Sequence, residues 1–179
     1  MLGILNRLKS DESLMLAYQR GDTGAFELLY QRHKDALYTF LFRCYPRNAV
    51  VEELAQDTWM AVINAVARYK PDARFRTWLY QIAHNRLVDH WRRPDNKHTN
   101  LEAVQEPYTQ GNDEAEELQS RVMTAIAQLP REQRDAILLQ QQGFSQADIA
   151  SITGAGGETI KSRLRYARDQ LRVQLGDEL

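Results

Sequence analysis

Apolar residues along this chain recur at intervals of three and four, the spacing of amphipathic α-helices, and no segment shows the alternation that indicates a β-strand. In the first half of the chain this spacing predicts four helices, over about 11–20, 23–45, 48–69 and 75–93. Ser10 can cap the first of these helices, and Gly21 is typical of the turn that ends it. Pro46 follows the end of the second helix, and Asn48 can cap the third.

The second half is predicted to hold helices over about 113–129, 130–143, 146–152 and 158–175. Between the halves, the segment from Pro94 to Asn112 is polar, carries two Pro and one Gly, and loses the apolar periodicity, which is typical of a linker. The predicted fold class is therefore all-α, with two small helical domains, 1–93 and 113–179, joined by a linker over 94–112.

Charge is distributed unevenly along the chain, although its net value is only −1. Residues 1–93 carry a net charge of +4, residues 94–120 carry −6, and the segment 159–172 alone carries +4. Two basic surfaces therefore flank an acidic segment, and basic surfaces of this kind attract nucleic acid.

Composition is that of an ordinary globular protein, with 43% hydrophobic and 26% charged residues among 179. No apolar run approaches the ~20 residues that cross a bilayer, and the first residues meet charges too early for a secretory signal. The single cysteine, Cys44, cannot form an internal disulfide. We therefore expect a reduced, cytoplasmic setting and no membrane insertion.

Residue patterns typical of enzymes are missing from the sequence. No two of the four His have the i,i+4 spacing of metal ligands on a helix, and there is no Cys pair or nucleophile elbow. The GAGG run at 154–157 follows a predicted helix rather than a strand, so it is better interpreted as a turn than as a phosphate loop. We expect no catalytic residue, no metal and no cofactor.

The segment from Ser145 to Arg172 has the pattern of a helix-turn-helix. Ser145 and Asp148 form a capping-box sequence, Gly154 lies in the expected turn, and a basic helix follows. The second helix of such a motif enters the major groove, so its exposed side chains are candidates for DNA contact. These are Thr159, Lys161, Ser162, Arg165 and Tyr166, with Arg163 and Arg168 for phosphates. The alternative is an amphipathic helix whose basic face is only hydrated.

The helix predicted over 75–93 divides its aromatic and polar residues between two faces. The expected core face is an apolar ridge of Leu79, Ala83, Leu87 and Trp91, with Phe75 and Ile82 beside it. The opposite face, with Trp78 at its boundary, suits extruded single-stranded bases, which stack on aromatics and pair with amides. Its candidates are Thr77, Gln81, His84, Asn85 and Arg92, with Lys70, Arg74 and Arg76 for the nucleic-acid backbone. The alternative is a solvated face.

The helix predicted over 48–69 presents an acidic face that contrasts with these basic surfaces. Four residues at helical spacing project from it: Glu53, Gln56, Asp57 and Met60. An exposed Met among acidic side chains favours a protein partner that carries basic groups, and an ordinary solvated face is the alternative.

Taken together, these segments resemble the extracytoplasmic-function (ECF) group of bacterial sigma factors, the promoter-recognition subunits of RNA polymerase. GAFELLYQRHKDALYTFLFR resembles region 2.1 of the family, EELAQDTWMAV resembles region 2.2, and FRTWLYQIAHNRLVDHWRR resembles regions 2.3–2.4. AIAQLPREQRDAILL, GFSQADIA and TIKSRLRYAR resemble region 4. The resemblance covers roughly residues 14–172. It implies a transcription initiation factor whose partners are promoter DNA, core RNA polymerase (its β′ coiled coil and β flap) and an anti-sigma factor.

The resemblance also implies roles for individual residues. Glu53, Gln56 and Asp57 match the surface that grips the β′ coiled coil, and Asn85 matches the residue that recognises a base flipped from the −10 element. Other matches form two groups: Asp72, Arg74 and Phe75 in the wall of the base pocket, and Lys161, Ser162, Arg165 and Tyr166 at the −35 element.

The turn before the basic helix departs from the family pattern. Family members usually have Val-Pro or Cys-Pro there, whereas this chain has Gly154-Ala155-Gly156-Gly157. Losing the proline loosens the start of the helix. The residues themselves are also compatible with two other classes of protein. One is a helix-turn-helix repressor or activator that binds duplex DNA without polymerase, and the other is a helical scaffold that binds neither.

Overall fold

The computed structural model describes residues 8–96 and 114–176, and the elements there are helical, as the periodicity predicts. Its α-helices are α2 (Asp11–Gln19), α3 (Thr23–Cys44), α4 (Asn48–Ala65), α5 (Phe75–Arg92), α6 (Glu114–Ala127), α7 (Arg131–Gln141), α8 (Gln146–Thr153) and α9 (Gly157–Leu175). Two short 3₁₀ helices are η1 (Val66–Arg68) and η2 (Pro94–Asn96). The predicted linker therefore begins with a 3₁₀ turn, and the rest of it lies outside the described residues.

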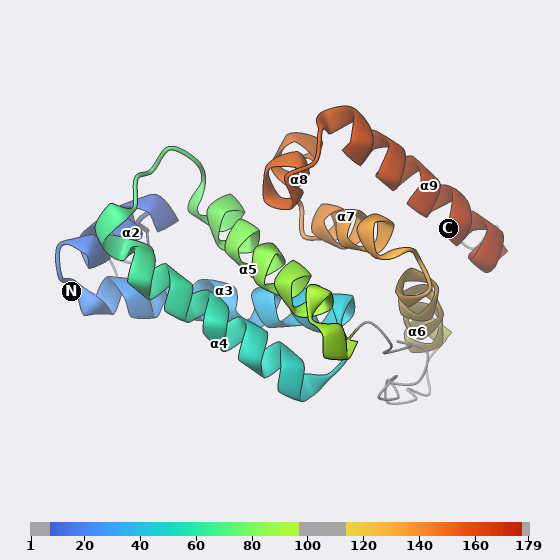
Figure 1. Ribbon diagram of the computed structural model, residues 1–179, viewed down its shortest axis with the longest axis horizontal. Helices are drawn as coiled ribbons and strands as arrows, with labels where there is room; N and C mark the ends of the chain where they lie inside the picture. Colours follow the sequence, from blue (N-terminus) through green and yellow to red (C-terminus); the bar gives the residue numbers. More distant parts are fainter. Residues whose placement is uncertain (1–7, 97–113, 177–179) are drawn as a thin grey trace.

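Helices α2 to α5 form the N-terminal bundle, in which α3 and α5 pack with α4 and α2 lies across one end (Figure 1). The buried side chains of α3 follow the three- and four-residue spacing that the sequence predicts; they are Ala25, Leu29, His33, Leu37, Phe40, Leu41 and Cys44. Ser10 caps α2 as predicted, accepting a hydrogen bond from the amide of Ser13 at 3.2 Å. The predicted cap of α4 is wrong by one residue, because Arg47 is the N-cap and Asn48 instead accepts from the Tyr38 hydroxyl.

Helices α6 to α9 form the C-terminal bundle, and α8 and α9 are the predicted helix-turn-helix. Ser145 and Asp148 make both hydrogen bonds of a capping box at the start of α8. Gly154 ends α8 in the left-handed conformation, with φ of 69°, which favours glycine. Leu118 is in phase with the apolar residues Val122, Ile126 and Leu129, which predicts it to be in the core, but it is 38% exposed because residues 115–119 of α6 all face solvent.

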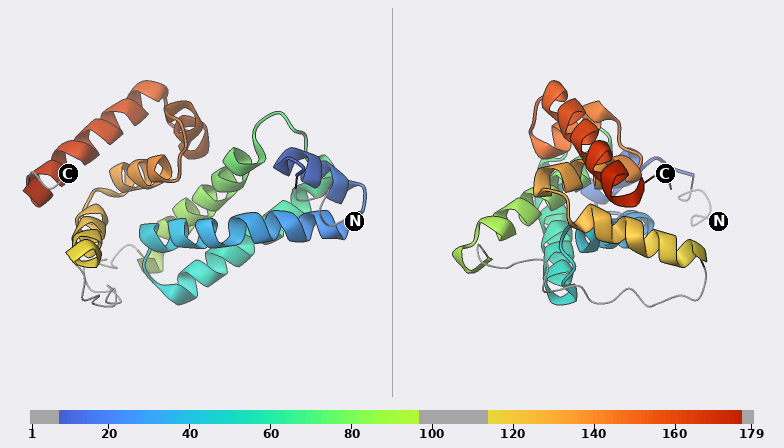
Figure 2. Two further views of the ribbon diagram at one scale, coloured as in Figure 1. Left: turned by 180° about the vertical axis from the view of Figure 1, so that it is seen from behind. Right: turned by 90° about the vertical axis from the view of Figure 1, so that its right-hand side faces the viewer.

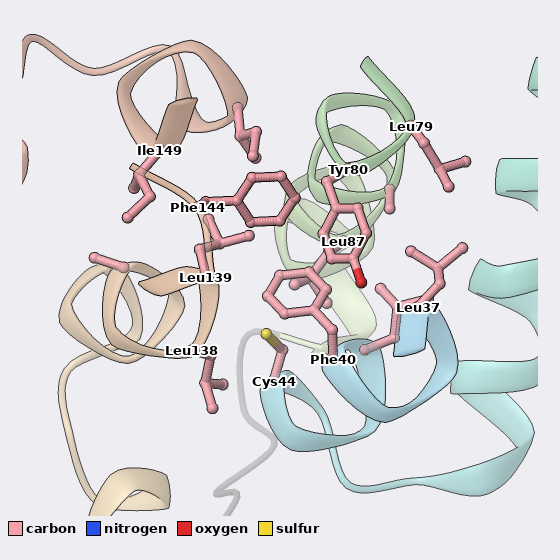
Figure 3. Packing of buried hydrophobic residues seen from close by; sticks show 14 of the residues in the cluster. Leu37, Phe40, Cys44, Leu79, Tyr80, Leu87, Leu138, Leu139, Phe144 and Ile149 are labelled. Carbon is pink, nitrogen blue, oxygen red and sulfur yellow. The ribbon is translucent and has the colours of Figure 1, made fainter. Parts of the chain in front are cut away.

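The two bundles pack against each other rather than standing apart on a tether (Figures 1 and 2). Helix α8 lies on α5, and α7 lies on the C-terminal half of α3. Between them, Tyr80 and Phe144 meet edge to face with ring centroids 4.8 Å apart. Figure 3 shows these rings beside Phe40 and Cys44 from one bundle and Leu139 from the other. A continuous apolar core therefore joins the two bundles, which the sequence pattern does not predict.

Within the described ranges, none of the helices has the length and apolar character needed to cross a membrane.

Candidate DNA and polymerase interfaces

The loop before α5 is held in place by side chains from α2. Glu12 accepts a hydrogen bond from the amide of Phe75 at 2.8 Å, which satisfies a free donor at the start of α5. The side-chain amide of Gln19 donates to the carbonyls of Val66 and Tyr69, at 2.8 and 3.1 Å. The backbone between η1 and α5 is thereby fixed at both ends, while residues 70–74 between them are exposed.

Phe75 lies inside the protein rather than in the wall of a surface pocket. It is completely buried, and its ring contacts those of His33 and Trp78, at centroid distances of 5.5 and 5.9 Å. The prediction that Phe75 lines a base pocket is therefore wrong for this structure, whereas its assignment to the core face is correct. Phe75 supports the loop from below.

A cavity of about 380 Å³ opens between this loop and the first turn of α5. Its lining residues are Ala65, Arg68, Tyr69, Lys70, Asp72, Ala73 and Trp78. The predicted candidates Lys70 and Asp72 belong to it, as does Trp78, which was predicted as the aromatic at the boundary of the polar face, but Arg68 and Tyr69 were not predicted. The signal that could have found them is the aromatic pair that brackets the loop, since the rings of Tyr69 and Trp78 lie 5.1 Å apart.

The chemistry of this cavity suits a flat, negatively charged ligand. The half-buried Trp78 supplies aromatic surface for stacking and is supported by the buried Tyr69 ring, while Arg68 and Lys70 supply positive charge at the rim. Burial, together with the nearby carboxylates of Glu12, Asp11 and Asp72, raises the pKa of Tyr69 to about 12. The phenol is therefore neutral at physiological pH and adds no repulsive charge.

The polar face of α5 is only partly open to solvent. Gln81, Asn85 and Arg92 are exposed as predicted. Thr77 and His84 are only 6% exposed, and both contact the C-terminal bundle. The expectation that these two residues face solvent is wrong here, because a unit distant in sequence covers them.

Two hydrogen bonds and a stacked arginine account for this burial. His84 Nε2 lies 3.2 Å from Asp135 Oδ2, and the Thr77 hydroxyl donates to Asp148 Oδ1 at 3.5 Å. The guanidinium of Arg76 donates to the carbonyl of Gln142, and its Cζ atom lies 4.2 Å from the ring centroid of Phe144. Arg76, predicted to reach a nucleic-acid backbone, is thus engaged between the bundles, whereas Arg74 is exposed.

The acidic face of α4 has the predicted composition and exposure. Glu53, Gln56 and Asp57 are exposed, and Met60 is 49% exposed. Behind this face, Trp59 is buried and packs edge to face against Tyr30 at 5.2 Å. The face is therefore a rigid, negatively charged strip with one apolar side chain.

Helix α9 has an apolar side packed into the C-terminal bundle and a basic side exposed to solvent. Thr159, Lys161, Arg165 and Tyr166 are exposed, and Ser162 is half-buried. Arg165 Cζ lies 5.0 Å from the Tyr166 ring centroid, so a cation–π contact orders this pair.

Two arginines predicted to contact phosphates instead tie α9 to α7. Arg163 donates to Glu132 at 2.9 Å, and Arg168 donates to the side-chain oxygen of Gln140 at 2.7 Å. Arg163 is largely covered and is therefore wrongly predicted as a free phosphate ligand in this structure, while Arg168 remains exposed. Across the described parts of the chain, no cluster of three or more His, Cys, Asp or Glu side chains is placed to hold a metal ion.

Comparison with known proteins identifies the family to which the chain belongs. Residues 29–97 match the family described as Sigma-70 region 2, and residues 119–171 match Sigma-70, region 4. The chain therefore belongs to the sigma-70 family of RNA polymerase sigma factors. The two matches fall on the N-terminal and C-terminal bundles described above.

Full-length relatives narrow the class to the ECF group. The chain is 30% identical to the RNA polymerase sigma factor CarQ of Myxococcus xanthus, over 91% of this chain and 96% of CarQ. It is also 30% identical to the ECF sigma factor SigM of Mycobacterium tuberculosis, over 94% of this chain and 86% of SigM. This chain is thus an ECF-type RNA polymerase sigma factor, a class of transcription initiation subunit that is not an enzyme.

Two solved structures share this fold over most of the chain, and one of them is a sigma factor bound to an anti-sigma factor. The structure of CnrH in complex with the cytosolic domain of CnrY has a TM-score of 0.72 and 26% identity, covering 96% of this chain and all of that chain. The sigma factor RpoE of Bartonella quintana, in complex with the anti-sigma factor NepR, has a TM-score of 0.70 and 25% identity, covering 86% of this chain and 98% of that one.

Proposed function

We propose that this sigma factor binds core RNA polymerase through the acidic face of α4, places α9 on the −35 element, and stabilises the melted −10 strand beside α5. The observation that carries the proposal is the aromatic and basic cavity beside Trp78, adjacent to the exposed amides of α5, in the segment matched by region 2.

Polymerase binding is assigned to Glu53, Gln56, Asp57 and Met60. Their carboxylates complement a basic partner such as the β′ coiled coil, and Met60 adds an adaptable apolar contact. This face lies on α4, whose main packing partners among the described residues are α3, α5 and η1 of its own bundle. It is therefore accessible whether or not the bundles are docked.

The −10 role divides between the cavity and the polar face of α5. Unstacking a base costs a few kcal/mol, and stacking on Trp78, at about 1–3 kcal/mol per base, offsets that cost. Asn85 supplies an amide for the edge of an extruded base, while Lys70, Arg74 and Arg92 supply charge for the phosphates. Phe75 acts only by supporting the loop.

The −35 role belongs to the exposed side of α9. Lys161, Arg165 and Tyr166 are the side chains best placed to meet base edges in a major groove, with Thr159 and Ser162 beside them. Arg168 remains a phosphate ligand in this proposal if it exchanges Gln140 for DNA.

Regulation by an anti-sigma factor is the remaining part of the proposal. It is supported by two structural neighbours: RpoE was solved in complex with the anti-sigma factor NepR, and CnrH in complex with the cytosolic domain of CnrY. We further propose that α9 and its bundle meet the β flap of polymerase and that the protein acts in the cytoplasm, where RNA polymerase works.

Reconstitution with core RNA polymerase tests the function directly. RNA 5′ ends mapped after overexpression should align on a shared −35/−10 pair, and the purified protein should direct core enzyme to initiate at those sites. Asn85→Ala should weaken open-complex formation about tenfold and change discrimination at one −10 position, whereas Arg86→Ala, one residue along the same helix, serves as the matched control.

Two results would decide against this proposal. Nanomolar binding to a duplex site by protein that does not copurify with core polymerase would establish a repressor or activator instead. Equal loss by Asn85→Ala at every −10 variant would remove the base-specific role of that residue.

A further inference from the structure

Another cavity, of about 1060 Å³, lies between the ends of α3 and α5 and the turn that joins α6 to α7. The charged residues in its lining are four arginines and one glutamate, a net charge of +3: Arg43, Arg131, Arg134, Arg163 and Glu132. Arg43, Arg131 and Arg134 are not among the residues proposed to contact polymerase or promoter DNA. The cavity is therefore a basic site that the proposed function does not use.

Only one of the four arginines has a counter-ion among the described residues. Arg163 Nη2 lies 2.9 Å from Glu132 Oε2. Within the same ranges, Arg43, Arg131 and Arg134 form no ion pair. Three positive charges at the cavity are thus left without a carboxylate to neutralise them.

Arg134 is the least exposed of these arginines, at 3%. Its Nη1 donates to the carbonyl of Ala127 at 3.2 Å, and its buried Nε has no hydrogen-bond partner among the described residues. A guanidinium has five N–H donors and stays charged at physiological pH. Because burying a charge without a partner is unfavourable, a buried cation that lines a cavity indicates that the cavity takes an anion.

Arg131 and Arg134 approach the same aromatic ring, which brings two positive charges together. Their Cζ atoms lie 5.6 and 5.8 Å from the ring centroid of Trp91, which also lines the cavity. Contact with the ring attracts each guanidinium, but like charges three residues apart on a helix repel each other. An anion bound beside Trp91 would remove that repulsion.

The start of α7 adds further positive potential to the cavity. Pro130 is the N-cap and supplies no side-chain hydrogen bond, and the amides of Arg131 and Glu132 have no acceptor among the described residues. Free amides and the dipole at a helix N-terminus attract anions, phosphate in particular. Residues 130–134 all line the cavity, so the helix end and the arginines form one site.

We propose that this cavity binds a small free anion with two or more phosphate groups, held by Arg43, Arg131, Arg134 and the N-terminus of α7. Several cations on different elements match a ligand with several charged groups better than a single sulfate or phosphate. Arg43 and Trp91 belong to the N-terminal bundle and α7 belongs to the C-terminal one, so the bound anion would contact both.

The backbone of promoter DNA is the other source of phosphate groups, and two observations favour a small anion. Arg134 is almost completely buried, whereas duplex DNA presents its phosphates on a broad convex surface. The cavity meets α9 at Arg163, which bonds to α7, whereas Lys161 and Arg165 of the proposed −35 surface are exposed. The site is therefore separate from that surface, and the proposal does not rest on promoter recognition.

Calorimetric titration of the full-length protein tests the site, with sodium pyrophosphate and sodium tripolyphosphate as the probes at constant pH and ionic strength. Tripolyphosphate should bind saturably, one per chain, and at least tenfold more tightly than sulfate. Arg131→Gln should weaken this binding about tenfold, the factor expected from losing one charge-assisted hydrogen bond. Arg20→Gln makes the same change in charge at the exposed end of α2 and should leave the affinity unchanged.

Two further variants locate the bound anion without replacing the buried Arg134. Arg43→Gln, at a half-buried position of α3, should weaken tripolyphosphate binding as Arg131→Gln does. Tripolyphosphate should also change the tryptophan fluorescence of the wild type, because its charge lies beside Trp91. Trp91→Phe keeps a ring for the two guanidiniums and should abolish that change.

Three results would overturn the proposal. The first is tripolyphosphate binding no tighter than that of sulfate, and the second is an equal loss in Arg20→Gln and Arg131→Gln, since either would show only a response to net charge. The third is an Arg131→Gln variant that binds a promoter duplex more weakly but tripolyphosphate normally, which would assign the cavity to the DNA backbone. Promoter-dependent initiation by the wild type decides the proposed function separately from these titrations.

Discussion

Glu12, at the start of α2, caps the first turn of α5 by accepting a hydrogen bond from the amide of Phe75, 63 residues further along the chain. A negative side chain at a helix N-terminus both satisfies a free donor and interacts favourably with the helix dipole. Arg74, the N-cap of α5, makes no capping hydrogen bond with its side chain, so the cap comes from a different helix. The position of the loop beside the cavity therefore depends on α2.

Replacing Glu12 with Ala should destabilise the protein by about 1 kcal/mol, the typical effect of losing a helix cap. Glu12→Gln keeps an acceptor oxygen and loses only the charge, so its effect should be smaller. Urea unfolding at neutral pH measures both. Glu27→Ala, which removes a carboxylate from an exposed position of α3, is the control. An equal effect at Glu27 would show that net charge, not capping, is responsible.

Acid sensitivity should depend on Asp11, which holds α2 against α3. Asp11 lies 2.7 Å from His33 Nε2 and 2.8 Å from Arg32 Nη1. Burial alone would raise the pKa of Asp11, but hydrogen bonds and charge from His33 and Arg32 outweigh it and hold the pKa below its ordinary value of 3.8. Because the folded-state pKa is below the unfolded value, the carboxylate stabilises the fold above pH 3.8, and this contribution is lost as pH falls through the folded-state pKa.

Asp11→Asn should therefore lower stability at neutral pH and flatten the loss of stability on acidification. The measurement is urea unfolding at a series of pH values from neutral to about 3. Asp35→Asn, at an exposed position of α3, provides the comparison. An acid limb that stays as steep in Asp11→Asn as in the wild type would assign the acid sensitivity to other groups.

The sequence predicts the helices well because each one buries a ridge that its own periodicity encodes. The helix-turn-helix was predictable for the same reason, with Ser145, Asp148 and Gly154 marking its ends. The exposure of individual polar residues was less predictable. His84 and Thr77 lie on the polar side of α5, and only a partner 51 or 71 residues away buries them.

The candidate site shows the same division between local and distant causes. Arg163 and Arg168 are basic residues of a helix-turn-helix and were therefore predicted to contact phosphates. Their observed partners, Glu132 and Gln140, lie 31 and 28 residues away on α7. The acidic face of α4 could be predicted from the spacing of residues within that helix alone, and its residues have the predicted exposure. Periodicity identifies the side of a helix that faces outward, but it does not identify the part of that side that another unit covers.

Charge reversal on α4 should separate polymerase binding from folding. Glu53→Lys with Asp57→Lys places two positive charges on the face proposed to meet a basic partner, and like charges across an interface cost several kcal/mol. Affinity for core polymerase should fall by about a hundredfold or more, with thermal stability nearly unchanged because both residues are exposed. Competition with another sigma factor for core enzyme measures the loss.

The matched control reverses two exposed acids on a different helix. Glu27→Lys with Asp35→Lys on α3 makes the same change in net charge away from the proposed face. It should compete for core polymerase as the wild type does. Undiminished competition by the α4 variant would remove the assignment of that face to polymerase.

Gly156, where family members usually have proline, should accept proline and gain stability. It is the N-cap of α9, with φ of −69° and ψ of 153°, and the φ lies within the range that the proline ring fixes. Its amide precedes the helical ladder, and Ala155 before it is non-helical, as a residue preceding proline should be. A methylene added at Gly156 meets only Thr159 Oγ1, at 3.9 Å. Gly156→Pro should therefore raise stability by about 0.4–1 kcal/mol, by restricting the unfolded chain.

A loss of stability is expected for a substitution at Gly154, two residues before Gly156. Comparing the two variants therefore tests the backbone geometry of the turn. Gly154 has φ of 69°, a conformation that costs other residues about 1–2 kcal/mol, so Gly154→Ala should destabilise even though the space around it is open. Urea unfolding of both variants measures whether each substitution raises or lowers the free energy of unfolding. If Gly156→Pro also destabilises, α9 does not begin with the backbone geometry described.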